Sequence, residues 1–326
     1  MTRHKLIIGS RGSQLALYQA HWVKTWLEQN HPDLSIAISI IKTSGDVFLD
    51  APLSQIGGKG VFTKEIEEAL LAEKIDLAVH SMKDLPTVLP EGLCLGAVPK
   101  REDARDAFLS NQFDSIDRLP AGARIGTSSL RRQSQLLLLR KDLQILNLRG
   151  NLDTRIRKLD EHQYDAILLA CAGLERLGLS HRIKQRIPID LMCPAVGQGA
   201  MGIEVRQKDK YIMDVLSRIH DNQATRAVMA ERTFLKRLGG GCQVPIAAHS
   251  WEAKGELQML GVVAKLDGSS IYRCQDQGPL GEAETLGTRL AEKLLEMGAQ
   301  QIVDDISALN LEVNKPAFVP PHQTNG

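Results

Sequence analysis

Short apolar runs and longer amphipathic stretches alternate along the first part of the chain. Leu6-Ile7-Ile8 and residues 34–41 and 75–80 are short and apolar, the second rich in β-branched residues, which favours buried strands. Between them, residues 15–27 and 63–74 carry apolar residues at helical spacing, and acidic residues lie in the first turn of the second stretch. Alternating strands and helices predict an α/β sheet, whose sites lie at the carboxyl ends of its strands.

The strand-turn-helix pattern of the N-terminus occurs a second time. Ile8-Gly9-Ser10-Arg11-Gly12-Ser13 has a counterpart in Ile125-Gly126-Thr127-Ser128-Ser129-Leu130-Arg131-Arg132. Both place glycine and hydroxyl residues between a strand and a helix, where backbone N–H groups and the helix dipole favour an anion. We expect two similar α/β lobes that face each other. The alternative is a coincidence of a common type of joint.

The second copy continues with the same alternation. Residues 143–148 and 164–170 are expected to be strands, Arg149-Gly150-Asn151 opens a helix, and residues 174–179 form a short helix.

The last hundred residues follow another pattern, beginning near Asp221. Apolar stretches at 257–266 and 269–275 flank Asp267-Gly268, which is a strong hairpin signal. Residues 283–297 read as an amphipathic helix that ends at Gly298. A small α+β domain is therefore expected. The proline-containing tail from Asn314 is expected to be disordered.

Composition narrows the classes of partner. The 326 residues can form roughly two to three domains. Aromatic residues make up only 4%, which argues against a surface that stacks bases. The net charge of +1 gives no global field toward nucleic acid or anionic lipid, so any anion site must be local.

The cysteines and the N-terminus favour a reduced, cytosolic enzyme. Five cysteines are widely spaced and form no C-x-x-C pair, which suggests neither a zinc site nor a disulfide framework. Only three apolar residues precede Gly9, too few for a signal-peptide core, and no apolar run approaches the length of a membrane span.

Two glycine-rich segments resemble nucleotide motifs without meeting their requirements. Gly197-Gln198-Gly199-Ala200-Met201-Gly202 fits G-x-G-x-x-G, but Pro194 precedes it and Ile203-Glu204-Val205 reads as a strand where a helix is needed. A glycine-rich crossing between lobes is expected instead. Gly57-Gly58-Lys59-Gly60 lacks the frame of a phosphate-binding loop and suits a mobile lid.

Cationic residues gather at the predicted strand-to-helix turns. Guanidinium groups bind carboxylates in a two-pronged fashion, so this set predicts a ligand with several carboxylates held between two lobes. Ordinary solvated surface charge is the alternative. The residues are Arg11, Lys83, Arg131, Arg132, Arg149 and Arg155.

Asp84 and Cys242 are the candidates for chemistry. Asp84 follows Lys83 at the end of a strand, where a neighbouring cation keeps it ionised and able to stabilise a developing positive charge. A salt-bridged turn residue is the alternative. Cys242 follows Gly239-Gly240-Gly241, so its thiol is presented without shielding side chains, although a buried structural cysteine in a tight turn is the competing interpretation.

These segments together resemble the porphobilinogen deaminase (hydroxymethylbilane synthase) family. The resemblance runs from about Leu6 to about Ile302 and rests on several long motifs in the same order. They are Gly9-Ser10-Arg11 with Leu15-Ala16, Gly57 to Gly60, Asp76 to Pro86, Gly126 to Arg132, Leu148 to Asn151, Pro194 to Gly199 and Gly240 to Pro245.

The resemblance implies two α/β lobes with mixed sheets, like those of periplasmic binding proteins, and a small α+β C-terminal domain. The lobes would comprise 1–99 with 200–219, and 100–199, and residues 220–326 would carry the cysteine loop. It further implies a dipyrromethane cofactor joined to Cys242 by a thioether. Four porphobilinogen units are then added, each with loss of ammonia, and hydrolysis releases hydroxymethylbilane. No metal, nicotinamide or flavin is needed.

The family also implies residue roles. Asp84 would stabilise the azafulvene cation left when ammonia departs and would bind pyrrole N–H groups. The cofactor-binding set is Ser81, Lys83, Asp84, Thr127, Ser128, Ser129, Arg131 and Arg132. The substrate-binding set is Arg11, Ser13, Gln19, Arg149, Gly150, Arg155 and Arg176, and the lid residues are Lys59 and Phe62.

A cytoplasmic monomer that passes its product to uroporphyrinogen-III synthase is the expectation. Two other classes remain. One is a solute-binding module for a polycarboxylate without catalysis, which the absent signal peptide and the presented cysteine disfavour. The other is a nucleic-acid binder that uses the arginines, which the low aromatic content and neutral charge balance disfavour.

Overall fold

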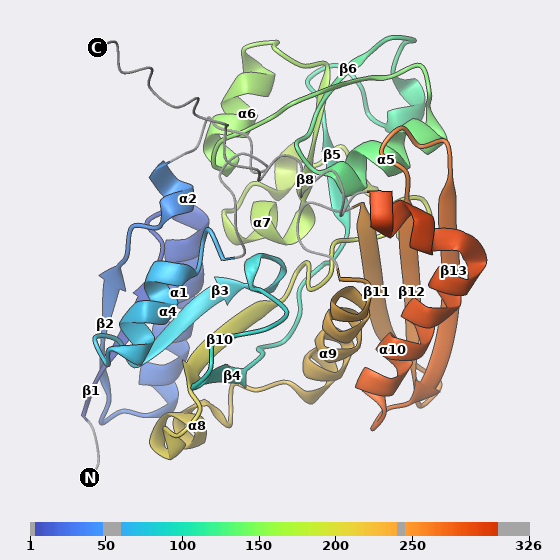
Figure 1. The fold of residues 1–326 in the computed structure, drawn as a ribbon. Helices are drawn as coiled ribbons and strands as arrows, with labels where there is room; N and C mark the ends of the chain where they lie inside the picture. The colour runs from blue at the N-terminus through green and yellow to red at the C-terminus, as the bar shows by residue number, and fades with distance from the viewer. Residues whose placement is uncertain (1–3, 48–59, 240–244, 306–326) are drawn as a thin grey trace, which may run out of the picture.

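The computed structural model describes residues 4–47, 60–239 and 245–305, which are organised around three β-sheets (Figure 1). The first sheet has the strand order β2-β1-β3-β10-β4. Its strands are β1 (Lys5–Ser10), β2 (Ser35–Ile40), β3 (Leu77–Ser81), β4 (Leu93–Ala97) and β10 (Met201–Arg206). The helices with them, here called the first lobe, are α1 (Gln14–Asn30), α2 (Ser44–Val47), α4 (Lys64–Leu71), the 3-10 turn η1 (Met82–Asp84) and α8 (Lys210–Leu216).

The second lobe is built on a sheet with the order β7-β6-β8-β5-β9. Its strands are β5 (Asp106–Leu109), β6 (Arg124–Gly126), β7 (Gln144–Leu146), β8 (Ala166–Ala170) and β9 (Gln185–Ile187). Its helices are α5 (Leu130–Leu139), α6 (Leu152–Asp160) and α7 (Cys171–Arg176), with 3-10 turns η2 (Ile116–Arg118) and η3 (Ser180–Arg182).

The two sheets share one topology, which confirms the expected pair of similar lobes. In each, three parallel strands (β2-β1-β3 and β7-β6-β8) are followed by two antiparallel pairings. The repeated turns occupy equivalent places, because one follows β1 and the other follows β6 at the carboxyl end of the second strand in each sheet. The chain crosses between the lobes twice, since β5 follows β4 and β10 returns to the first sheet.

The C-terminal part forms a three-stranded antiparallel sheet, β11-β12-β13, with two helices against it (Figure 1). Its elements are α9 (Asn222–Arg237), β11 (Ile246–Ala253), β12 (Glu256–Ala264), β13 (Ile271–Pro279), α10 (Ala283–Leu294) and the π-helical turn η4 (Leu295–Ala299). The predicted hairpin is confirmed: the amide of Gly268 donates to the carbonyl of Lys265 at 3.0 Å, and β12 and β13 flank this turn. The α+β expectation for this region is correct.

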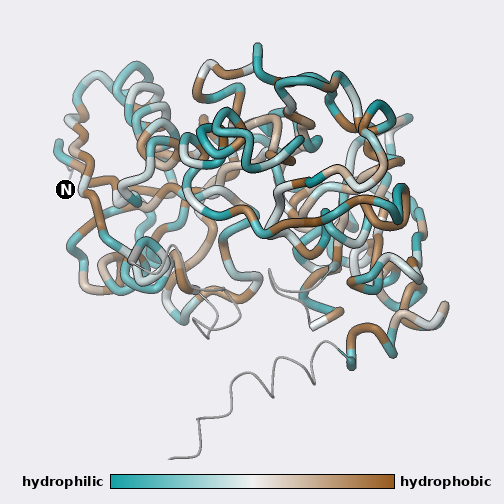
Figure 2. The backbone as a smooth tube through the Cα atoms, turned by 90° about the horizontal axis from the view of Figure 1, so that it is seen from above, coloured by the Kyte–Doolittle hydropathy of each residue, from teal (hydrophilic) through white to brown (hydrophobic). Residues whose placement is uncertain are grey.

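The spacing of apolar residues explains how the helices pack against the sheets to form hydrophobic cores in the two lobes and the C-terminal part. In α1, Ala20, Val23 and Leu27 recur at helical spacing and are fully buried against the first sheet, and the hydroxyl of Ser13 caps the helix by accepting from the amide of Ala16 at 3.3 Å. Separate apolar clusters fill the second lobe and the C-terminal part. Figure 2 shows hydrophobic and hydrophilic stretches alternating along the backbone.

Several sequence-based boundaries need correction. The helix expected at 174–179 is α7, which spans Cys171–Arg176. The C-terminal helix does not end at Gly298: that residue takes φ 113° at a kink, and helical residues continue to Asp305. Strands β4, β5, β9 and β11 were not predicted. The tail from Asn314 lies outside the described residues. Within the described ranges, no helix is both long and apolar enough to cross a bilayer.

The segment Gly197–Gly202 leads into β10 rather than into a helix, so rejecting a dinucleotide fingerprint is correct. Gly199 has φ +86°, and its carbonyl accepts hydrogen bonds from the amide of Glu102 at 3.2 Å and from Arg176 Nη2 at 3.0 Å. These hydrogen bonds join the two segments that cross between the lobes, one at Gly199 and one at Glu102, and bind Gly199 to the second lobe through Arg176.

Gly199→Ala is expected to lower the free energy of unfolding by about 2 kcal/mol or more, since positive φ and steric crowding act together. A Cβ at this position would lie 2.7 Å from the carbonyl oxygen of Glu102 and 3.2 Å from the Cα of Ala104. Gly178→Ala is the matched control, because Gly178 has φ +70° and nothing within 4 Å of a Cβ. Urea unfolding of both variants measures the difference. Equal losses would contradict the role given to the crowded crossing.

Candidate active site

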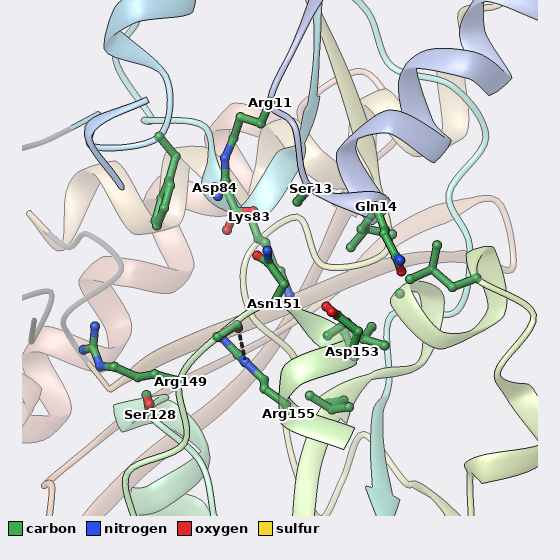
Figure 3. Close-up of a pocket in the computed structure, with 18 of the residues that line it drawn as sticks. Arg11, Ser13, Gln14, Lys83, Asp84, Ser128, Arg149, Asn151, Asp153 and Arg155 are labelled. Atoms are coloured by element: carbon green, nitrogen blue, oxygen red, sulfur yellow. Dashed lines mark hydrogen bonds between the residues drawn. The ribbon is translucent and has the colours of Figure 1, made fainter. Parts of the chain in front are cut away.

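A cavity of about 310 Å³ lies between the first and second lobes, within the size range of small-molecule sites. Figure 3 shows Arg11, Ser13, Lys83 and Asp84 on one side, facing Ser128, Arg149 and Arg155 on the other. Phe62, Arg132 and Gly150 also line it. The cavity therefore lies where the carboxyl ends of strands in both sheets meet, as the turn pattern predicted.

Lys83 and Asp84 form the turn η1 that directly follows β3. The turn is closed by the amide of Leu85, which donates to the carbonyl of Met82 at 3.2 Å. Burial lowers the pKa of Lys83 to about 8. The negative charge of Asp84 acts in the opposite direction, and the positive charge of the nearby Arg132 lowers the pKa further. Lys83 is thus a cation whose charge is lost just above neutral pH, next to a carboxylate in the same cavity.

Arg131 and Arg132 lie in the first turn of α5 and are buried, with 5% and 6% of their surfaces exposed. Both guanidinium groups pair with Asp106 at 2.7 Å. Arg132 reaches the cavity wall, whereas Arg131 does not line either cavity among the described residues. Burial lowers the pKa of Arg132, although Asp106 offsets part of this effect.

Arg149 and Arg155 come from the loop and helix that follow β7. Arg155 Nε donates to the carbonyl of Gly150 at 2.7 Å, which curls the side chain back toward the loop (Figure 3). Gly150 has φ +111°, a conformation that side chains rarely permit. Burial, together with Arg132, lowers the pKa of Arg155 to about 10. Both arginines line the same cavity as Asp84.

Arg11 is held by two partners at the rim. Its Nη2 lies 2.6 Å from an Asp46 oxygen, and its guanidinium carbon lies 4.2 Å from the centre of the Phe62 ring. Burial alone would raise the pKa of Asp46, but the hydrogen bonds from Arg11 and Thr43 outweigh it and lower that pKa. Arg11 is therefore oriented by a carboxylate that sequence reasoning missed.

A smaller cavity of about 60 Å³ adjoins the first and shares Arg11, Ser13, Phe62 and Asp84 with it. Gln19 and Ser81 line it and hydrogen-bond to each other, with Gln19 Nε2 donating to Ser81 Oγ at 3.0 Å. These two predicted residues therefore lie beside Asp84 but not in the main cavity wall.

Four predicted residues are not brought into either cavity. Arg131 binds Asp106 and the carbonyl of Cys193, and the Oγ1 of Thr127 accepts from the amide of Ser129 at 3.2 Å. Arg176, 7% exposed, is paired with Glu102 at 2.7 Å next to the crossing. The predicted ligand roles of Thr127, Ser129, Arg131 and Arg176 stay predictions. Lys59 and Cys242 lie outside the described residues.

The cavity carries more positive than negative charge. Five cationic side chains (Arg11, Lys83, Arg132, Arg149, Arg155) and two acidic ones (Asp84, Asp153) line it. Such an arrangement suits a ligand with several carboxylates, which would complete the charge balance. The acids stand on either side of the cavity, and Asp84 is placed to meet positive charge that develops on a bound ligand.

Two of the described cysteines are poor nucleophiles. Burial raises the pKa values of Cys171 and Cys193 to about 12, so both are thiols at neutral pH. Neither lines the main cavity. The chemistry of the cavity therefore does not use these two sulfur atoms.

Two family models cover most of the chain. The first, described as "Porphobilinogen deaminase, dipyromethane cofactor binding domain", matches residues 6–214, and the second, "Porphobilinogen deaminase, C-terminal domain", matches residues 225–296. Curated relatives carry the name porphobilinogen deaminase. The chain is 52% identical over 303 residues to the one from Syntrophotalea carbinolica, which covers 93% of this chain and 96% of that one. It is 48% identical over 320 residues to the one from Geobacter sulfurreducens, which covers 98% and 100%.

Among solved structures, the chain is similar to the methionine-binding protein MetQ, with a TM-score of 0.41 and 14% identity over 69% of this chain and 91% of that one. It is also similar to a periplasmic substrate-binding protein of an ABC transporter from Coxiella burnetii, with a TM-score of 0.42 and 14% identity over 66% and 92%. Likenesses of this strength carry no argument about the site.

Proposed function

Because the chain belongs to the porphobilinogen deaminase family, we propose that Asp84 and the cations around it carry out the family's reaction in the cavity between the two lobes. The protein is an enzyme of tetrapyrrole synthesis that joins four porphobilinogen units, each with loss of ammonia, on a dipyrromethane cofactor and releases hydroxymethylbilane. The solute-binding alternative is not favoured. The observation that supports the proposed site best is that five cationic side chains line the same cavity as Asp84.

The cavity fits the cofactor. Two linked pyrroles carry two acetates and two propionates, and the cationic excess of the cavity matches such a set. Gly173 lies in the wall beside Leu152 and Leu15, and a Cβ there would lie 3.3 Å and 3.6 Å from their side chains. When bound, the cofactor supplies the pyrrole carbon to which the first substrate unit is joined. Lys83, Ser128 and Arg132 are the cavity-lining residues that we assign to its acidic groups.

Asp84 is assigned to the reacting centre. Asp84 lies at the end of η1 and lines both cavities. A pyrrole bound in either cavity would therefore lie near its carboxylate. As the amine of porphobilinogen leaves, the pyrrole becomes cationic, and a fixed carboxylate stabilises that charge more in the transition state than in the ground state. Its oxygens can also accept the pyrrole N–H hydrogen bond.

The substrate and the growing chain are assigned to the remaining polar groups. Arg11, Arg149 and Arg155 offer guanidinium groups to carboxylates from three different segments around the cavity. Ser13, Gln19 and Ser81 lie at the smaller cavity next to Asp84. Phe62, which lies over Arg11, belongs with Lys59 to the proposed lid.

Cofactor attachment is assigned to Cys242 on the strength of the Gly240-Gly241-Cys242-Gln243-Val244-Pro245 motif. A thiolate is a suitable nucleophile toward an electron-poor methylene carbon. The high pKa values of Cys171 and Cys193 support the assignment, because those thiols are unreactive at neutral pH.

We further propose domain bounds of 1–99 with 200–219, 100–199, and 220–326. The three sheets fall within these bounds, and Asp221 caps α9 by accepting from the amide of Ala224 at 2.7 Å. A cytoplasmic location, classification as a transferase, a monomeric state and transfer of the product to uroporphyrinogen-III synthase complete the proposal. The free thiols of the four described cysteines are compatible with a reducing compartment.

The function is tested by incubating the purified protein with porphobilinogen. Formation of hydroxymethylbilane with release of one ammonia per substrate unit is expected. Porphobilinogen that binds without being consumed would leave a solute-binding protein.

Arg132→Leu is expected to slow cofactor acquisition by about tenfold to hundredfold, because a charge-assisted hydrogen bond is worth about 1.5–3 kcal/mol. Arg157→Leu removes the same charge from α6 at an exposed ion pair with Glu161 and is expected to acquire cofactor normally. The added mass, followed over time by mass spectrometry, measures both. Normal acquisition in Arg132→Leu would remove this residue from the cofactor site.

Cofactor acquisition is expected to weaken as the pH rises through about 8. Lys83 is charged below its pKa of about 8 and neutral above it, so its attraction for carboxylates is present at low pH and lost at high pH. Lys83→Arg, which stays charged, is expected to show a flatter profile between about pH 7 and 9.5. Identical profiles for the two proteins would exclude titration of Lys83 as the cause.

A further inference from the structure

Asp106 is a buried carboxylate behind the cavity wall that the family motifs did not single out. It is the first residue of β5, pairs across the sheet with Ala170 of β8, and has 0% of its surface exposed. Ala170 itself lines the main cavity. Asp106 thus lies one strand away from the cavity without forming part of its wall.

The carboxylate collects hydrogen bonds from three side chains. Arg131 donates through Nη1 at 2.7 Å and Nη2 at 3.1 Å, and Arg132 donates through Nε at 3.0 Å and Nη2 at 2.7 Å. Gln198 Nε2 donates to the same carboxylate at 2.9 Å. Gln198 belongs to the segment that returns to the first lobe before β10, so the network joins α5, β5 and the chain between the lobes.

Backbone carbonyls complete the fixation of both guanidinium groups. Arg131 Nη1 donates to the carbonyl of Cys193 at 2.6 Å, and Arg132 Nη1 donates to that of Leu168 at 2.9 Å. Each guanidinium is therefore held from two directions. A planar group fixed in this way loses little further freedom when it binds a carboxylate.

The charges of the network do not cancel. Two guanidinium groups meet one carboxylate, which leaves one positive charge. Burial alone would raise the pKa of Asp106, but Arg131 and Arg132 outweigh it and lower that pKa, so the carboxylate stays ionised. Lys83 is close enough to feel all three groups. The remaining positive charge faces the cavity through Arg132.

We propose that Asp106 is a positioning residue that, by binding Arg131 and Arg132 together, holds Arg132 in the geometry required to bind a carboxylate of the dipyrromethane cofactor, an inference that rests on the proposed function of this cavity. Without this carboxylate, two neighbouring guanidinium groups repel each other and keep only their carbonyl contacts. The net positive charge of the network would increase, but the guanidinium groups would no longer be held in a fixed orientation. The proposal thus separates the effect of geometry from that of net charge.

The test measures cofactor acquisition by full-length apoprotein produced without porphobilinogen and then incubated with a series of porphobilinogen concentrations. For Asp106→Asn, the half-saturating concentration is expected to rise by about tenfold or more, corresponding to loss of one charge-assisted contact. Glu231→Gln is the matched control: Glu231 has 0% exposure and pairs with Arg101 at 2.6 Å away from the cavity. This control is expected to be destabilised yet to keep the wild-type half-saturating concentration.

Two results would overturn the proposal. One is the same half-saturating concentration in Asp106→Asn and Glu231→Gln at equal folded fractions. The other is tighter acquisition in Asp106→Asn, as expected if only net charge mattered. If Asp106→Asn does not fold, Gln198→Leu removes one donor to Asp106 and leaves every charge in place. It is expected to raise the half-saturating concentration, and no change in that folded variant would overturn the proposal. Failure of the wild-type protein to acquire any cofactor would instead contradict the proposed function.

Discussion

Cys242→Ser is expected to fold but to carry no covalent pyrrole, and its turnover is expected to fall at least about a thousandfold, or 4 kcal/mol. A serine hydroxyl is a far weaker nucleophile than a thiolate without a base to activate it. Without the anchored cofactor, the first substrate unit has no acceptor fixed in the cavity. The rate of hydroxymethylbilane formation measures the loss.

Cys274→Ser is the control for this prediction. Cys274 is a half-buried thiol on β13, and it does not line the cavities. Its replacement is expected to leave cofactor content and turnover at wild-type levels. Full activity in Cys242→Ser, or loss in Cys274→Ser alone, would contradict attachment at Cys242.

Asp84→Ala is expected to keep the fold and to lose turnover by about a hundredfold to a thousandfold, the range found when one electrostatic stabiliser of a transition state is removed. Asp84 lines the cavity from the turn η1, which a backbone hydrogen bond between Leu85 and Met82 closes. Removing the carboxylate therefore leaves the turn intact and opens no void in the hydrophobic core. Single-turnover rates with holoenzyme separate this effect from cofactor assembly. Asp153→Asn removes the other acid of the cavity wall and is expected to change the rate less than about tenfold. A loss below tenfold in Asp84→Ala would remove Asp84 from the mechanism.

Much of the fold could be predicted from local patterns. The apolar run Leu6-Ile7-Ile8 and the turn after it reappear at Ile125, and the two sheets indeed place both turns at the carboxyl end of equivalent strands. The pairing of strands that are distant in sequence could not be predicted from local patterns. β5 and β10 are short apolar stretches whose place in each sheet depends on strands far away in sequence. The kink at Gly298 shows why a helix end was misplaced, because the chain resumes its helix after one residue with positive φ.

The candidate site could be predicted where residues follow strands directly. Lys83 and Asp84 were found by that rule, Arg132 was found in the first helical turn after β6, and all three line the cavity. Asp46, which pairs with Arg11, lies in α2, the short helix after β2, and this second strand-to-helix joint of the first lobe was a signal that went unused. Asp106 gave no local signal, because its partners lie 25 and 92 positions away in the chain.

The intact mass of the purified protein tests the central claim most directly. The account predicts a mass above that of the 326-residue chain by two linked pyrroles, with the addition on the peptide that contains Cys242. An unmodified mass that stays unchanged after incubation with porphobilinogen would contradict it.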